Sequence, residues 1–434
     1  MKNELNRSVP PLVVLPENIK VPHAAEQKLD NGMPIFIVNS GEDPVCRIDV
    51  LLNAGSRYQQ NNLEATATAS LLSEGTTLNN SQQIAEFLDY HGSFIDLSAD
   101  RDWGKVTLYC LEKYFERSIA MLAELVMQPI FPEKELKIWS ERSKQKLTLE
   151  LDRTSTLARQ AFFNQLYGKN HPYGRFATPS DYNLLESNKL LSFHKKHFSF
   201  ANSTIILSGS VGEMEFGIVN KYFGKEEWGG QNEPVYAPIA FNKPGIGLKF
   251  VEKKDAVQSA IRIGCRLIKR NHPEYPIMLI VNTILGGYFG SRLMKNIREE
   301  KGYTYGINSH IVTLRDDGFF VIGTEVGSQF TQLAIKEIRN EIERLRHEPV
   351  GESELQQVKS YMWGEALRSF NGPFAIADNV ISLLNFNNLD YGFYDQLFKT
   401  IKEAKSENIM NAARKWLNVD EMVCCVAGSV NPEA

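Results

Sequence analysis

The sequence has little of the chemistry that marks several common protein classes. Its 434 residues include five cysteines and eight histidines, and no histidine lies between His23 and His91. Few cysteines, odd in number and mostly within apolar runs, indicate reduced and buried thiols instead of a disulfide framework. No apolar run approaches the roughly 18 residues that a membrane-spanning helix needs. We therefore expect no membrane span and a globular protein from a reducing compartment.

A large excess of charge of either sign is also absent. The formal net charge is −4, which gives no reason to expect nucleic acid or an anionic membrane as a partner. Residues 1–9 are polar and lack the apolar core of a secretory signal. The sequence therefore predicts a cytoplasmic protein, and its length leaves room for roughly two to four domains.

The two halves of the chain carry the same succession of strand and helix signals. Arg101-Asp-Trp-Gly, placed before a strand, recurs as Arg315-Asp-Asp-Gly before another. Both halves end on a similar apolar strand that runs into Gly-Ser-Val, at Gly209 and Gly428. A repeat this long indicates duplicated domains and not a solenoid. We therefore predict an α+β fold of two duplicated domains, each a mainly antiparallel sheet with helices packed largely on one face.

The boundary between the two predicted domains is set by composition. Residues 226–245 hold several glycines and prolines, which is typical of an extended and semi-stiff connector. The sequence thus predicts an N-terminal domain over residues 1–225, a linker over 226–245 and a C-terminal domain over 246–434.

The most informative stretch spans residues 282–309. Leu293, Met294 and Ile297 have the spacing of a short helix that buries one face, and Gly302 stands where a helix C′ residue would. A strand is expected from residue 303 on, so Arg298 and Tyr305 lie near one helix–strand corner. A guanidinium and a phenol both donate hydrogen bonds at neutral pH, which suits gripping carbonyls or carboxylates. An ordinary surface arginine beside a half-buried tyrosine would have the same spacing.

This stretch closely resembles the second-domain signature of the pitrilysin (insulinase) family, the inverted zincins. The matching pieces are the glycines before Ser-Arg-Leu, then Ile-Arg-Glu and Gly-x-x-Tyr, in register. The resemblance extends over nearly the whole chain. It implies that Arg298 and Tyr305 hold the backbone of a peptide substrate beside a catalytic zinc ion.

The zinc motif of the family is missing where the resemblance places it. In catalytic members a helix carries His-x-x-Glu-His just before Gly-Thr, so that two imidazoles bind zinc and the glutamate acts as general base. A later glutamate completes the site. Counting from Gly75, the corresponding positions are occupied by Thr66, Ala69, Ser70 and Lys146. None of these side chains is a plausible zinc ligand, so we expect no catalytic residue and no metal in this chain.

The two-subunit members of the family divide the work between similar chains. The resemblance implies that this chain is the non-catalytic subunit of a heterodimeric zinc endopeptidase, inactive alone, which closes the chamber and contributes Arg298 and Tyr305. The implied partner is a homologous catalytic subunit that carries His-x-x-Glu-His and holds the zinc. One alternative is a structural or assembly subunit without peptidase duty, since core subunits of respiratory complexes resemble the family too. Another is a homodimeric peptide-binding chamber.

Other candidate residues carry weaker signals. His194 and His197 share a predicted helix without a carboxylate beside them, which favours a solvated or partly packed pair. Cys424 and Cys425 alternate in a predicted strand, so one of the two is expected to face the core. The loop that starts at His171 is interpreted as structural.

Overall fold

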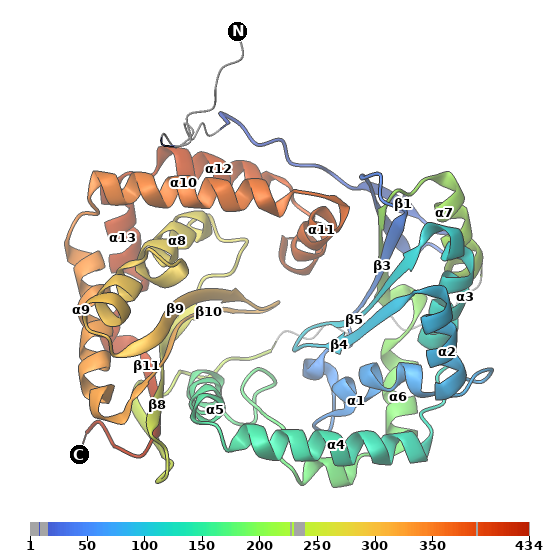
Figure 1. The fold of residues 1–434 in the computed structure, drawn as a ribbon, viewed down its shortest axis with the longest axis horizontal. Helices are drawn as coiled ribbons and strands as arrows, with labels where there is room; N and C mark the ends of the chain where they lie inside the picture. The colour runs from blue at the N-terminus through green and yellow to red at the C-terminus, as the bar shows by residue number, and fades with distance from the viewer. Residues whose placement is uncertain (1–7, 9–15, 226–227, 230–238, 388, 434) are drawn as a thin grey trace.

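Two β-sheets, one from each half of the chain, form the frame of the molecule (Figure 1). The computed structural model describes residue 8 and residues 16–225, 228–229, 239–387 and 389–433. The six-stranded first sheet has the order β1-β2-β6-β3-β5-β4, and the five-stranded second sheet has the order β7-β11-β8-β10-β9. The strands of the first sheet are β1 (Ala25–Lys28), β2 (Pro34–Asn39), β3 (Val45–Leu52), β4 (Phe94–Ala99), β5 (Gly104–Leu111) and β6 (Ser203–Gly209). Those of the second are β7 (Gly247–Glu252), β8 (Gln258–Leu267), β9 (Thr304–Thr313), β10 (Gly318–Gly327) and β11 (Val423–Gly428).

The two sheets have the same topology once β1 is set aside. In each, the first strand of the half pairs in parallel with the last, β2 with β6 and β7 with β11. The remaining pairs are antiparallel and follow in the same order. The predicted α+β class with duplicated, mainly antiparallel sheets is therefore confirmed. The predicted domain boundaries stay a prediction, because residues 226–227 and 230–238 of the expected linker lie outside the described residues.

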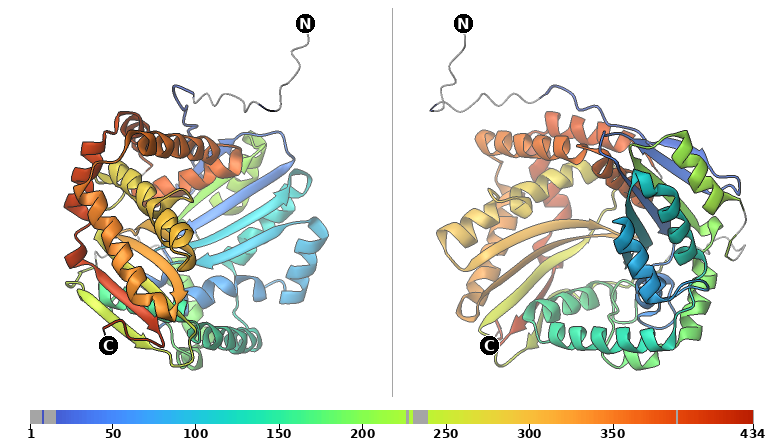
Figure 2. Two further views of the ribbon diagram at one scale, coloured as in Figure 1. Left: turned by 60° about the vertical axis from the view of Figure 1, so that its left-hand side comes forward. Right: turned by 45° about the vertical axis from the view of Figure 1, so that its right-hand side comes forward.

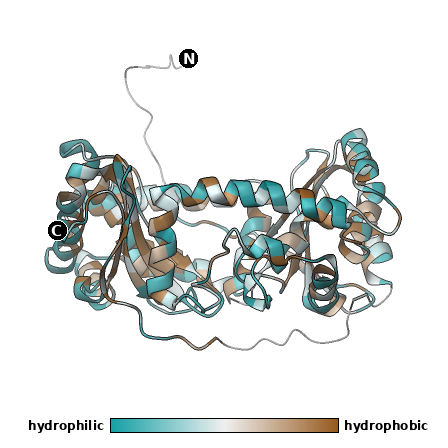
Figure 3. Ribbon diagram, turned by 90° about the horizontal axis from the view of Figure 1, so that it is seen from below, coloured by the Kyte–Doolittle hydropathy of each residue, from teal (hydrophilic) through white to brown (hydrophobic). Residues whose placement is uncertain are grey.

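Helices pack alongside both sheets, with their apolar faces turned inward (Figure 3). In α9 the buried residues Ile338, Ile342 and Leu345 recur at helical spacing and bury one face against the second sheet. None of the helices in the described ranges is long and apolar enough to cross a membrane. The helices of the first half are α1 (Glu64–Ser70), α2 (Ser81–His91), α3 (Phe115–Met127), α4 (Glu133–Leu151), α5 (Thr154–Tyr167), α6 (Ser187–His197) and α7 (Glu213–Val219). Those of the second are α8 (Tyr275–Asn282), α9 (Thr331–His347), α10 (Glu352–Ser369), α11 (Pro373–Asn387), α12 (Gly392–Glu403) and α13 (Ser406–Trp416).

Each half also lends one helix to the sheet of the other half (Figure 2). Helix α5 packs across β8 and β11, and α11 packs against β6 and β2. These helices cover the faces that the remaining helices leave open. As a result Cys424 and Cys425 are both fully buried, each in the core on a different face of the second sheet. The expectation that only one of the two would face the core is therefore wrong. A helix from the other half of the chain supplies the second layer.

The contact between the halves is completed by a buried ionic network. The guanidinium of Arg57 lies 3.1 Å from a carboxylate oxygen of Asp102 and 2.7 Å from one of Asp316. The hydroxyl of Tyr173, which comes from the loop interpreted as structural, donates to Asp102 at 2.7 Å. The backbone N–H of Arg315 donates to the other oxygen of Asp102 at 2.9 Å. The two repeated turns, at Arg101 and Arg315, are thereby joined through a single arginine.

We predict that Arg57→Met lowers the free energy of unfolding by about 3 kcal/mol or more, because it leaves two buried carboxylates without their cation. Lys221→Met is the matched control, since the ion pair of Lys221 with Glu116 is half exposed and should contribute far less, because water and salt screen it. Urea unfolding of both variants measures the difference. Equal losses in the two variants would contradict the role of the buried network.

The predicted histidine pair is buried, and not solvated. Both rings are shielded, and Nε2 of His194 donates to the carbonyl oxygen of Val126 at 2.8 Å. Burial lowers the pKa of His194 from 6.5 to about 4. The unfolded chain therefore takes up a proton first as the pH falls below 6.5, and stability is lost progressively down to about pH 4.

The variant His194→Gln keeps an N–H donor but cannot ionise. We expect it to lose less free energy of unfolding than the wild type between pH 7 and pH 4, by on the order of 2 kcal/mol. Unfolding curves at several pH values check this expectation. If the free energy of unfolding fell equally with pH in the wild type and the variant, His194 would not be the cause of the loss of stability.

Candidate functional site

The corner that was predicted to hold Arg298 and Tyr305 is built from a tight helical turn and an edge strand. Residues Met294–Glu300 form a π-helical turn, a geometry that is often found at functional sites. Leu293, Met294 and Ile297 are buried in the core of the second sheet, as their spacing predicted. Gly302 adopts a left-handed φ of +65° and its N–H donates to the carbonyl oxygen of Arg298 at 3.2 Å, which ends the helix. The turn packs on β9, so the two candidate residues come from adjacent elements.

Tyr305 sits on a β-bulge near the start of β9. The pairing of β9 with β10 shifts so that Tyr305 and Gly306 together face Glu325. The hydroxyl of Thr304 donates to the carbonyl oxygen of Glu325 at 2.7 Å, and that of Thr324 donates to the carbonyl oxygen of Gly306 at 3.0 Å. A bulge re-aims the side chain at its extra residue. Here the tyrosine is 92% exposed, so the half-buried alternative is wrong.

Arg298 is partly exposed, and it pairs with no carboxylate of the described residues. Its guanidinium lies 5.0 Å from the centre of the Phe289 ring, which is itself 63% exposed. Across the described ranges, no carboxylate oxygen lies within 4.0 Å of the guanidinium of Arg298. The hydroxyl of Tyr305 likewise makes no hydrogen bond with any described residue. The fold therefore leaves both groups available as hydrogen-bond donors.

The residues at the family's zinc positions do not fit zinc. Ala69 is buried in α1, whereas Thr66 and Ser70 are partly exposed on the same helix. Lys146 is exposed on α4. A methyl group, two hydroxyls and an ammonium group offer none of the nitrogen, thiolate or carboxylate ligands that zinc takes in proteins. In the part of the chain that the structure describes, no group of three histidine, cysteine or acidic side chains is placed to hold a metal ion.

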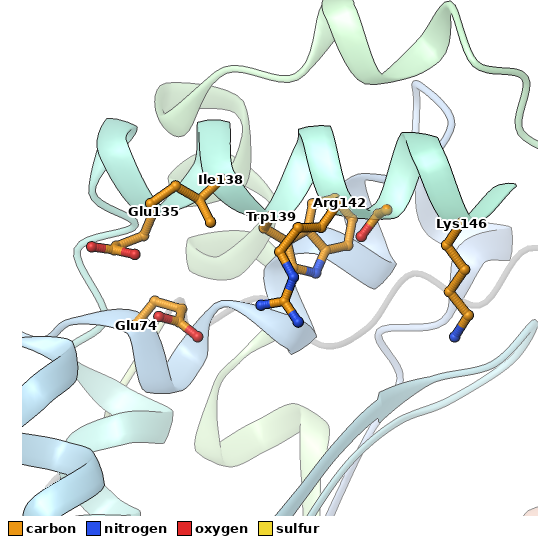
Figure 4. A pocket seen from close by; sticks show the side chains of 7 residues that line it. Glu74, Glu135, Ile138, Trp139, Arg142 and Lys146 are labelled. Carbon is orange, nitrogen blue, oxygen red and sulfur yellow. The ribbon is translucent and has the colours of Figure 1, made fainter. Parts of the chain in front are cut away.

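Lys146 instead helps to line a hollow of about 470 Å³ beside α4 (Figure 4). Arg142 and Lys146 extend from successive turns of α4 to the same side, and Glu74 approaches from the segment after α1. Burial raises the pKa of Glu74, and repulsion from Glu135 adds to the rise. The hollow thus mixes two cations with two carboxylates around Trp139, and nothing in it reproduces a zinc ligand set.

A second hollow, of about 280 Å³, surrounds Tyr305 and was not predicted. It is lined by Gln258, Arg262, Thr304, Tyr305, Gly306, Asn308, Gly323, Thr324 and Glu325. Arg262 could have drawn attention to this hollow, because it and Arg266 are the two charged residues of the otherwise mostly apolar strand segment from Ala260 to Leu267.

Two family models match this chain. Residues 35–170 match the model described as insulinase (peptidase family M16), and residues 185–362 match the one described as peptidase M16 inactive domain. The first match includes Thr66, Ala69, Ser70 and Lys146, and the second includes Arg298 and Tyr305.

Relatives and solved structures agree with these matches. An uncharacterized zinc protease of Bacillus subtilis is 21% identical over 92% of this chain and 97% of its own length. One of Rickettsia felis is 24% identical over 89% and 93%. Among solved structures, a peptidase M16 inactive domain from Pseudomonas fluorescens superposes with a TM-score of 0.83 at 24% identity, covering 94% of this chain and 98% of that one. A protease from Helicobacter pylori gives 0.84 at 17% identity, with coverage of 94% and 100%.

The exposure of Tyr305 predicts that the side chain contributes nothing to folding. Tyr305→Ala should change the free energy of unfolding by less than about 0.5 kcal/mol. Ile307→Ala, two residues along the same strand but buried in the core, should cost about 2–5 kcal/mol. Denaturant unfolding compares the two. A large loss in Tyr305→Ala would mean that the tyrosine is a structural residue.

Proposed function

This chain belongs to the M16 (insulinase) family of peptidases, and we propose that it is the non-catalytic subunit of a heterodimeric zinc endopeptidase of that family. Its own task is to close the chamber and to hold the peptide substrate through Arg298 and Tyr305. The zinc ion and the general base belong to a homologous partner that carries His-x-x-Glu-His.

One observation carries the proposal: the fold presents a tyrosine to solvent on a bulge that two threonine hydroxyls hold in place. The residues that would make zinc chemistry possible, by contrast, are replaced by Thr66, Ala69 and Ser70. A chain that lacks the reactive groups but displays free donors is suited to binding a peptide and not to cleaving it.

The chemistry of the corner fits an extended peptide. The guanidinium of Arg298 and the hydroxyl of Tyr305 can both donate to carbonyl oxygens. β9 is the last strand of its sheet, and no other strand of the described residues pairs with its outer edge. An extended segment can add to such an edge through main-chain hydrogen bonds. Holding the peptide in a fixed place lowers the barrier to attack by groups of the partner, since positioning and electrostatic stabilisation do not require covalent chemistry.

The test is cleavage of an unstructured peptide by the pair, co-purified from native cells and then produced recombinantly. Arg298→Ala and Tyr305→Phe should each lower the activity of the pair by at least about tenfold, as loss of a positioning donor usually does. Arg344→Ala, an exposed arginine on the outer helix α9, is the matched control and should leave cleavage unchanged. Alone, the chain should neither cleave the peptide nor bind zinc stoichiometrically.

Unchanged cleavage in both Arg298→Ala and Tyr305→Phe would overturn the substrate-binding role. The vacated zinc positions would then fit the alternative of a structural or assembly subunit. Co-purification with membrane redox proteins, instead of with a chain that carries His-x-x-Glu-His, would favour that alternative.

A further inference from the structure

A guanidinium without a carboxylate partner among the described residues lies close to Tyr305, on the face of the second sheet that α5 packs against, which we call the inner face. Arg262 on β8 stands opposite Gly323 on β10, which in turn stands opposite Asn308 on the edge strand β9. Its two chain neighbours, Ile261 and Ile263, face the apolar core on the other side of the sheet. Arg262 therefore points to the inner face, toward the hollow that Tyr305 also lines.

Because Gly323 has no side chain, the side chain of Arg262 can extend over it toward the edge strand. A Cβ atom at position 323 would lie 2.8 Å from Nη1 and 3.1 Å from Cζ of Arg262. The guanidinium thus lies across the glycine, in the space that any other residue would fill. Glycine weakens a strand interior, and it often marks a close approach at such a position.

The pairing of the half-buried Arg262 differs from that of the buried arginines. Arg47, Arg57 and Arg292 each meet at least one carboxylate at 3.1 Å or less. Arg262 donates one hydrogen bond, at 3.1 Å, to the carbonyl oxygen of its neighbour Ile261. No carboxylate oxygen of the residues that the structure describes lies within 4.0 Å of it, so most of its donors are unused.

The surroundings of this guanidinium make it attractive to an anion. The side chain of Arg262 is half-buried, and this burial lowers its pKa. Glu325 is an exposed acidic residue in the same hollow, and Arg159 on α5 adds a second positive charge nearby. The net charge of Arg262, Arg159 and Glu325 together is therefore positive. A guanidinium in this setting pairs well with a carboxylate, because charge-assisted hydrogen bonds strengthen as water is excluded.

We infer that Arg262 is a further peptide-binding residue of this chain and takes a carboxylate of the substrate, so that the site prefers peptides with an acidic residue beside the segment held at Tyr305. The inference rests on the proposed function, since it assumes that a peptide occupies this corner. It adds a specificity that neither Arg298 nor Tyr305 supplies when they grip the backbone.

The test uses two fluorescently labelled, unstructured peptides that differ by Glu or Gln at one interior position, scanned along the peptide. Binding to the purified chain is followed by fluorescence anisotropy. At the best position the Glu peptide should bind about fivefold more tightly than the Gln peptide, the size expected for a partly exposed ion pair. Arg262→Gln should abolish this ratio, and Arg262→Lys should retain part of it.

Two further variants separate a binding role from a folding role. Gly323→Ala should displace the guanidinium while leaving its charge, and should reduce the ratio at unchanged thermal stability. Arg344→Gln makes the same change in net charge on the outside of α9 and should preserve the ratio. A Glu preference that survives in Arg262→Gln, or its absence from the wild type, would overturn the assignment of Arg262.

The same assay keeps this inference apart from the proposed function. Arg298→Ala and Tyr305→Phe should weaken both peptides equally. If the wild type binds neither peptide, the proposed function fails and the inference fails with it. If it binds both without preference, the role of Arg262 alone is wrong.

Discussion

The pairing of Arg57 with Asp102 and Asp316 is the interaction on which the arrangement of the molecule depends. It lies where the β4–β5 turn of one half meets the β9–β10 turn of the other. Strand β10 begins just after this turn and carries β9 at the edge of the sheet, with the bulge at its far end. A buried cation between two carboxylates therefore fixes the strand pair from which Tyr305 projects. The helices α5 and α11, each packed on the sheet of the other half, add apolar area to the same contact.

The site at the end of β9 combines rigidity with exposure. Threonine hydroxyls hold the backbone of the bulge, a glycine with positive φ ends the preceding turn, and the apolar side of that turn is buried. The donors themselves are left free. This division is what a preorganised binding site requires, because groups that are already in place lose little conformational entropy when a ligand arrives.

Much of this architecture could be predicted from the sequence, because local patterns carry it. The repeated turns at Arg101 and Arg315 and the repeated strand endings revealed the duplication, and the spacing of Leu293 and Ile297 located the helical turn. Contacts between distant segments could not be predicted in the same way. Burial of both Cys424 and Cys425 depends on α5, which comes from the other half of the chain. The exposure of Tyr305 depends on a bulge whose register is set by β10, and the opening beside Arg262 depends on Gly323 across the sheet.

The central claim is that an extended peptide lies at the corner formed by Arg298 and Tyr305. Photo-crosslinking tests it most directly: a peptide carrying one photoreactive residue is bound to the full chain, irradiated, and its attachment sites are mapped by mass spectrometry. Crosslinks should concentrate within residues 298–308 and on the facing part of β10. Crosslinks that are absent from this segment and gathered on the outer helices α9 or α12 would contradict it.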